Sequence, residues 1–190
     1  MTTAIYSTTT ETGIDINAVF ILSTGTPEYP RPPFIPGQLA WGTDGSEWVY
    51  CTASITIAAG NAVLISAVPA SWSVALLGGA SLAAYPIGQA IGIVGGSTGT
   101  MVVPAPVSPQ TGTYFWVQRA GNCPNVTTLA STTKNAQLYD VAATAGALSS
   151  SSPGTASGFQ VSGIVVTQAT GSAAGPNTAF LNYPVVGAAT

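Results

Sequence analysis

Residues 38–51 read QLAWGTDGSEWVYC and decide the fold. The dipeptide Asp44-Gly45 lies between two runs that are rich in aromatic and aliphatic residues. Asp-Gly favours the type I′ turn of a two-residue hairpin loop, and aromatic and β-branched side chains fit a pleated sheet. The stretch therefore predicts a β-hairpin whose strands are 38–43 and 46–51.

Several segments after this hairpin also predict short strands. The chain has 22 Gly and 14 Pro among its 190 residues, and turns rich in Gly, Ser or Pro separate most of these segments. Such a series predicts an all-β fold, either a small β-barrel or a sandwich that is closed to hide its strand edges. The expected strands are Ala62–Ser66, Ser71–Leu77, Gly88–Val94, Thr113–Arg119, Gln137–Asp140, Gln160–Thr167 and Thr178–Tyr183.

The first 36 residues have a different character. Ile14–Asn17 alternates between apolar and polar residues like a short strand, and Val19–Leu22 is an apolar run. Pro27–Pro36 is rich in proline, which makes it extended and semi-rigid. We therefore expect an extended N-terminal arm with a Pro-rich spacer (1–36), followed by a β-barrel domain (37–190).

The apolar side chains of this arm are the candidate partner-contact residues. Their exposure to water would be an aggregation liability for a chain with so little charge. In the alternative interpretation, Ile14–Leu22 is an ordinary strand of the same barrel. The candidates are Ile14, Ile16, Val19, Phe20, Ile21, Leu22, Tyr29 and Phe34.

The charge content excludes several functions. Only 5% of the residues are charged, with three Lys and Arg, no His and a net charge of −3. Nucleic-acid binding needs many basic side chains, whereas a Ser-His-Asp triad or a His-based metal site needs histidine. We expect no nucleic acid, no metal and no cofactor as partners. A hydroxyl-rich surface with so little charge predicts association within an assembly.

Membrane insertion is not expected either, although the mean hydropathy is +0.42. Residues 48–118 carry no charge, but Gly, Pro and Ser interrupt every long apolar window. Residues 1–13 lack both a basic region and an apolar run, so they do not predict a secretory signal.

Three motifs that suggest catalysis lack the partners that they need. Gly95–Gly99 fits G-x-S-x-G but has no histidine, and Ser131–Lys134 fits S-x-x-K without the companion motifs of that enzyme class. Asp44 and Glu47 flank an expected hairpin tip, where solvent would prevent the raised pKa of a glycosidase acid. We therefore expect that the protein is not an enzyme.

The cysteines and tryptophans are interpreted as core residues. Cys51 and Cys123 fall in separate expected strands, which favours two buried free thiols, although a disulfide would form if those strands meet. All four tryptophans also fall in expected strands, where large aromatic residues are more often core than part of a sugar-binding face.

Four short motifs, taken in order, resemble the decoration (cement) proteins of tailed-bacteriophage capsids. In that family an aromatic-Trp-Val-Gln strand precedes an N-A-x-L-Y strand, and the domain closes on G-I-V and A-x-L-N-Y-P. The resemblance runs from about Pro33 to Val186, whereas the first 30 residues and Ser66–Tyr85 depart from it. The corresponding segments are Phe115–Gln118, Asn135–Tyr139, Gly163–Val165 and Ala179–Pro184.

The resemblance implies a non-enzymatic β-barrel or β-tulip module in the virion. Such a protein is made in the host cytoplasm, binds the phage major capsid protein on the outer capsid surface, and stabilises the capsid by bridging its subunits. The resemblance also implies a homo-oligomer, a trimer or a dimer. The alternative function is a phage head-fibre or tail-associated adhesin that binds host glycans, which exposed tryptophans would favour.

Overall fold

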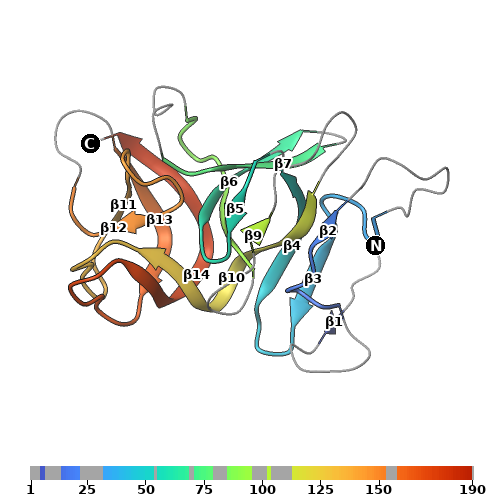
Figure 1. Ribbon diagram of the computed structural model, residues 1–190, viewed down its shortest axis with the longest axis horizontal. Coiled ribbons are helices and arrows are strands. Elements are labelled where there is room, and N and C mark those ends of the chain that lie inside the picture. Colours follow the sequence, from blue (N-terminus) through green and yellow to red (C-terminus); the bar gives the residue numbers. More distant parts are fainter. Residues whose placement is uncertain are drawn as a thin grey trace.

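The computed structural model is all-β and contains a closed five-stranded β-barrel, which confirms the fold class expected from the sequence (Figure 1). It describes residues 5–6, 14–21, 32–53, 55–68, 71–78, 85–95, 102–103, 113–152 and 158–189, and these residues contain no helix. Twelve strands form one sheet, and β5 (Ile57–Ala58) and β9 (Val102–Val103) form a separate two-stranded sheet.

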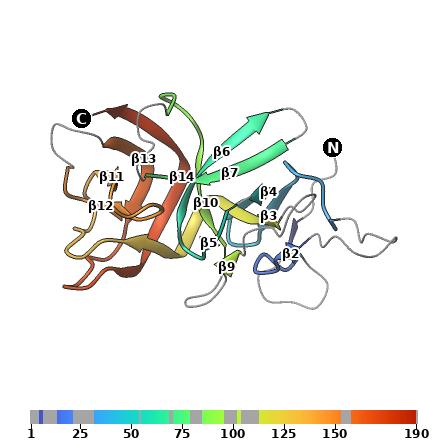
Figure 2. The ribbon, with the colours of Figure 1, turned by 45° about the horizontal axis from the view of Figure 1, so that its top comes forward.

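Strand pairing closes the large sheet into two rings of five strands, which share β10 (Thr113–Thr128) (Figures 1 and 2). The first ring runs through β4 (Glu47–Ala53), β7 (Ser71–Leu76), β6 (Ala62–Val68), β8 (Ile91–Val94) and β10. The second ring runs through β10, β12 (Leu148–Ser149), β11 (Leu138–Asp140), β13 (Phe159–Val166) and β14 (Gly175–Ala189).

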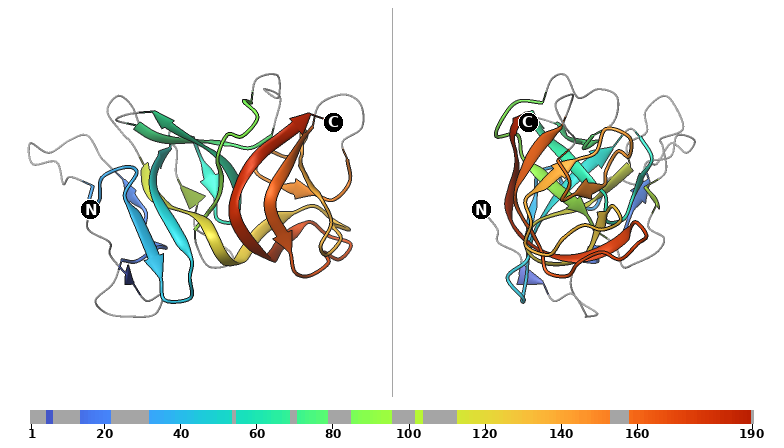
Figure 3. Two further views of the ribbon diagram at one scale, coloured as in Figure 1. Left: turned by 180° about the vertical axis from the view of Figure 1, so that it is seen from behind. Right: turned by 90° about the vertical axis from the view of Figure 1, so that its left-hand side faces the viewer.

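Strand β10 joins the rings because it changes partners along its length. Its first half pairs with β4 and β8, and its second half, from Ala120 to Thr128, pairs with β14 (Figure 3). A register shift between Gln118 and Ala120 marks the change, so the strand expected to end at Arg119 continues for nine more residues to Thr128. Pro124 lies within a second register shift, between Cys123 and Val126, where a missing backbone donor is tolerated.

Each ring encloses its own hydrophobic core. Cys51, Val63 and Phe115 belong to the core of the first ring, whereas Cys123 and Leu181 belong to the core of the second. Because side chains alternate along a strand, β6 and β8 point a second set of residues outward, and these residues join the second core. The two rings are therefore packed against each other as one body.

The hairpin lies where the sequence predicts it, between β3 (Leu39–Gly42) and β4, but its turn differs. The Gly45 amide donates to the Gly42 carbonyl (3.1 Å), and the Gly42 amide donates to the Ser46 carbonyl (2.8 Å). Only Gly45 of these loop residues has a positive φ, of 80°. The predicted type I′ turn is wrong: the loop has three residues, a type I turn followed by glycine in the left-handed region.

The expected strand at Ile14–Asn17 is also wrong, because Asp15 makes a turn there. The Asp15 carbonyl accepts a hydrogen bond from the Ala18 amide (3.1 Å), and its carboxylate accepts one from the Asn17 amide (2.9 Å). A short strand follows, β2 (Phe20–Ile21), which pairs with the start of β10. Asp15 stops the alternating pattern from forming a strand because its side chain bonds to the local backbone.

Candidate functional site

The predicted partner-contact residues that the structure describes lie against the protein's own barrel. Ile14 is buried with Trp48, Tyr50 and Trp116, and Ile16 packs against the same cluster. The Phe34 ring centroid lies 5.1 Å from that of Trp116.

In the structure, Ile14, Ile16 and Phe34 therefore pack on their own barrel, which is where the alternative interpretation of this segment places it. Val19 packs against the first core, and Phe20 lies 6.2 Å from Tyr114 between ring centroids. The segment covers apolar side chains on the outer face of β4 and β10. Leu22 and Tyr29 lie outside the described residues, and of Ile21 only the backbone is described.

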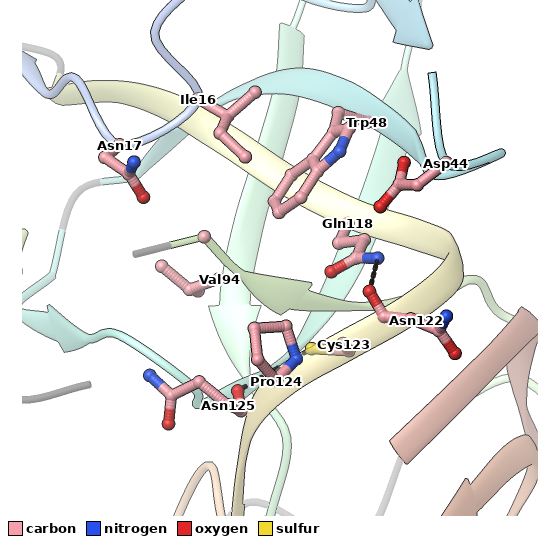
Figure 4. A pocket seen from close by; sticks show the side chains of 11 residues that line it. Ile16, Asn17, Asp44, Trp48, Val94, Gln118, Asn122, Cys123, Pro124 and Asn125 are labelled. Atoms are coloured by element: carbon pink, nitrogen blue, oxygen red, sulfur yellow. Dashed lines mark hydrogen bonds between the residues drawn. The ribbon is translucent and has the colours of Figure 1, made fainter. Parts of the chain in front are cut away.

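This packing creates a pocket of about 260 Å³ between the N-terminal segment, the β3–β4 hairpin and β10 (Figure 4). Four segments that are distant in the sequence contribute to its wall. Its large apolar lining residues are Ile16, Trp48, Val94 and Pro124. The other lining residues are Asn17, Asp44, Gly95, Gln118, Asn122, Cys123 and Asn125.

A chain of hydrogen bonds fixes one side of the pocket. The Trp48 indole N–H donates to the Ser46 hydroxyl (3.0 Å), and that hydroxyl donates to Asp44 Oδ1 (2.7 Å). The Ser46 amide also donates to Oδ1, at 3.0 Å. The hydroxyl bond is the main reason that the pKa of Asp44 lies below its ordinary value of 3.8, so this carboxylate is ionised at neutral pH.

Gln118 forms the floor of the pocket, and only 1% of its surface is exposed. Its amide nitrogen donates to the carbonyls of Ala120 (3.0 Å) and Asn122 (2.8 Å), so its amide oxygen must point the other way. Figure 4 shows this oxygen on the side of Trp48 and Val94, and it has no hydrogen-bond partner. The floor therefore carries a buried acceptor that lacks a donor.

The two carboxylates of the hairpin lie in different environments. Glu47 is buried, which corrects the expectation that both flank a solvent-facing tip, and its Oε2 accepts a hydrogen bond from the Tyr183 hydroxyl (2.8 Å). The Arg119 guanidinium lies over the Tyr183 ring, 5.5 Å from its centroid. These contacts join the hairpin to β14, and Tyr183 reaches them from a strained backbone with a φ of 46°.

The other sequence motifs do not come together as a reactive site in the described residues. Ser131 and Lys134 are both exposed in a turn, and of Gly95–Gly99 only Gly95 is described. No group of three potential metal ligands occurs within the described ranges. These ranges also contain no helix that is long and apolar enough to cross a membrane.

Both cysteines are free and buried, as the sequence favours. Cys51 belongs to the core of the first ring and Cys123 to that of the second, so the two thiols do not meet. Burial raises the pKa of Cys51 to about 12 and that of Cys123 to about 11. The protonated thiols are poor nucleophiles, and they act as small apolar core residues.

Asp140 gives a prediction about pH. Its Oδ1 accepts a hydrogen bond from the Phe159 amide (2.6 Å), its Oδ2 is buried without a partner, and burial raises its pKa above 3.8. The folded chain therefore holds the proton of the Asp140 carboxyl group more tightly than the unfolded chain does. The stability that this proton contributes is fully present below pH 3.8 and is lost as the pH rises through the pKa of Asp140 in the folded state. We expect Asp140→Asn to raise the melting temperature at pH 7, and the gain to vanish below pH 3.8.

Thermal unfolding of both proteins across this pH range checks the prediction. Asp44→Asn is the control with the opposite sign, because the lowered pKa of Asp44 adds stability above pH 3.8 that is lost as the pH falls. It should lower the melting temperature at pH 7. If Asp140→Asn raised the melting temperature equally at every pH, the raised pKa of Asp140 would not be the cause of the gain.

Comparison with models of protein families and with curated proteins finds no match to this chain.

Proposed function

We propose that the protein is a structural, non-enzymatic component of a phage virion that binds the outer capsid surface and stabilises it by bridging capsid subunits. The proposal rests on the ordered motifs that resemble capsid decoration proteins. Its partners would be the major capsid protein and other copies of this chain, as a dimer or a trimer. Synthesis in the host cytoplasm and assembly onto the outer capsid surface follow from the same proposal.

One structural observation carries the proposal furthest: large apolar side chains are exposed on a surface with almost no charge. Ile35 is 77% exposed and Ile87 is 73% exposed, each within a turn. Val165 and Phe180 face each other across β13 and β14, and nearly half of each is exposed. Single exposed apolar residues are common on protein surfaces, but adjacent ones such as Val165 and Phe180 are typical of surfaces that bind another protein.

The architecture supports the same role. The two rings share one long strand and pack their cores against each other, so the exposed groups are held on a rigid support. The glycan-binding alternative would be favoured by exposed tryptophans, but Trp48 and Trp116 are buried, and Trp41 and Trp72 are half-buried. We therefore do not propose the adhesin function.

Co-sedimentation with expanded phage heads tests this function. The wild-type chain is expected to sediment with heads and to appear on their outer surface by electron microscopy. Phe180→Asp should weaken this binding by at least about tenfold, because burying an unpaired charge costs more than 1.4 kcal/mol.

Ser162→Asp is the matched control, since Ser162 is also exposed on β13 and the change adds the same charge. It should alter binding little if it lies outside the contact. The proposal fails if the wild-type chain does not bind heads, or if it decorates only the tail.

A further inference from the structure

We propose that the pocket between the N-terminal segment and β10 binds an organic cation, an ammonium or guanidinium group on an apolar stem. The inference rests on the pocket residues alone and does not depend on the capsid role. It follows from which hydrogen-bonding groups of the pocket are already satisfied, from its charge, and from the apolar character of its walls.

The pocket wall also carries the side-chain amides of Asn17, Asn122 and Asn125, each of which brings both donors and acceptors, so the groups that set its balance are Asp44, Trp48 and Gln118. The Trp48 indole N–H is bonded to Ser46, and the Gln118 amide nitrogen is bonded to two carbonyls. The Gln118 amide oxygen has no partner, and a buried acceptor without a donor costs about 1–3 kcal/mol. Ammonium and guanidinium groups carry several donors and no acceptor, whereas a sugar hydroxyl brings both. The unmet acceptor and the ionised Asp44 carboxylate together therefore favour a cation over a neutral sugar.

The charge of the pocket has the matching sign. Asp44 is the only charged residue in its wall, and the hydrogen bonds from Ser46 keep it ionised. Of the two basic residues that the structure describes, neither forms an ion pair with Asp44, and Arg119 is stacked on Tyr183. A cation at this end of the pocket would therefore meet a carboxylate without a competing internal partner.

The walls define the rest of the ligand. Ile16, Trp48, Val94 and Pro124 offer apolar contact to a short alkyl or aryl stem. The volume of about 260 Å³ lies below the range of about 300–1,000 Å³ that is typical for drug-sized ligands. The occupant is therefore one small group, either a free amine or the Lys or Arg side chain of a partner protein.

Titration of the intact protein with small probes, followed by NMR, tests the proposal. The Trp48 indole N–H signal is the reporter, because it is connected to Asp44 through the Ser46 hydroxyl. Phenethylamine is expected to shift this signal, whereas phenethyl alcohol, its neutral counterpart, should not. Asp44→Asn should weaken amine binding by up to about fivefold, the range of a solvent-accessible ion pair.

Asp15→Asn is the matched control. Asp15 is an exposed carboxylate beside the pocket residue Ile16 but does not line the pocket, and asparagine preserves its bond to the Asn17 amide. It should change amine binding by less than twofold. If Asp44→Asn disturbs the fold, the wild-type protein still tests the proposal. Added salt should weaken the binding of phenethylamine and should not change the result with phenethyl alcohol.

Blocked lysine and arginine amides distinguish the two sources of the cation. Binding of these amides supports a partner side chain, and binding of phenethylamine alone supports a free amine. Equal binding of phenethylamine and phenethyl alcohol, or equal effects of Asp44→Asn and Asp15→Asn, would overturn the proposal.

Discussion

Trp116→Ala is expected to lower the free energy of unfolding by about 3–5 kcal/mol, the usual cost of removing a large buried aromatic side chain. Trp116 is 1% exposed, and its ring centroid lies 5.0 Å from that of Tyr50 and 5.1 Å from that of Phe34. The ring fills the space between β10 and the N-terminal segment, where β-sheet backbone on one side limits collapse into the cavity.

Equilibrium denaturation in urea measures this loss. Phe180→Ala is the control, because Phe180 is also an aromatic residue of the twelve-stranded sheet but is 48% exposed. This substitution should lower the free energy of unfolding by less than about 1 kcal/mol. A loss below about 1 kcal/mol for Trp116→Ala would mean that the N-terminal segment does not cover the ring in solution.

Deletion of residues 1–26 is expected to destabilise the barrel by at least about 3 kcal/mol, because it exposes apolar surface that the segment covers. The deletion removes Ile14, which is buried, together with Ile16, Val19 and the pairing of β2 with β10. Thermal and urea unfolding of the truncated and full-length chains measure the difference.

Deletion of residues 1–13 is the matched control, since it stops just before Ile14. The difference between the two truncations isolates the contribution of residues 14–26. If the longer deletion leaves the melting temperature unchanged but abolishes oligomer formation or head binding, the segment is a partner-binding arm after all.

Much of the local structure was predictable from the sequence. The hairpin around Asp44-Gly45 and the positions of β6, β7 and β13 depend on turn residues and on branched or aromatic runs, which act over a few neighbouring residues. The free state of Cys51 and Cys123 was also favoured by their places in separate strands.

The candidate pocket was not predictable. The sequence indicates that Asp44 is a poor catalytic acid and that Trp48 is a core residue, and it does not connect the two. Nothing in the sequence links them to Ile16, Val94 or Gln118, because no local pattern records which distant segments meet. The single available signal was a polar glutamine, Gln118, at the end of a strongly apolar run.

The sequence by itself determined an all-β chain with little charge, since composition and short-range patterns decide whether a segment forms a strand. Only the tertiary structure decided that β10 passes from one ring to the other and that Ile14 and Phe34 lie on their own barrel. An apolar run has the same sequence pattern whether its own domain or a partner protein covers it in the folded state. Which surface covers it depends on the burial and packing that long-range contacts provide, and those contacts form only in the folded chain.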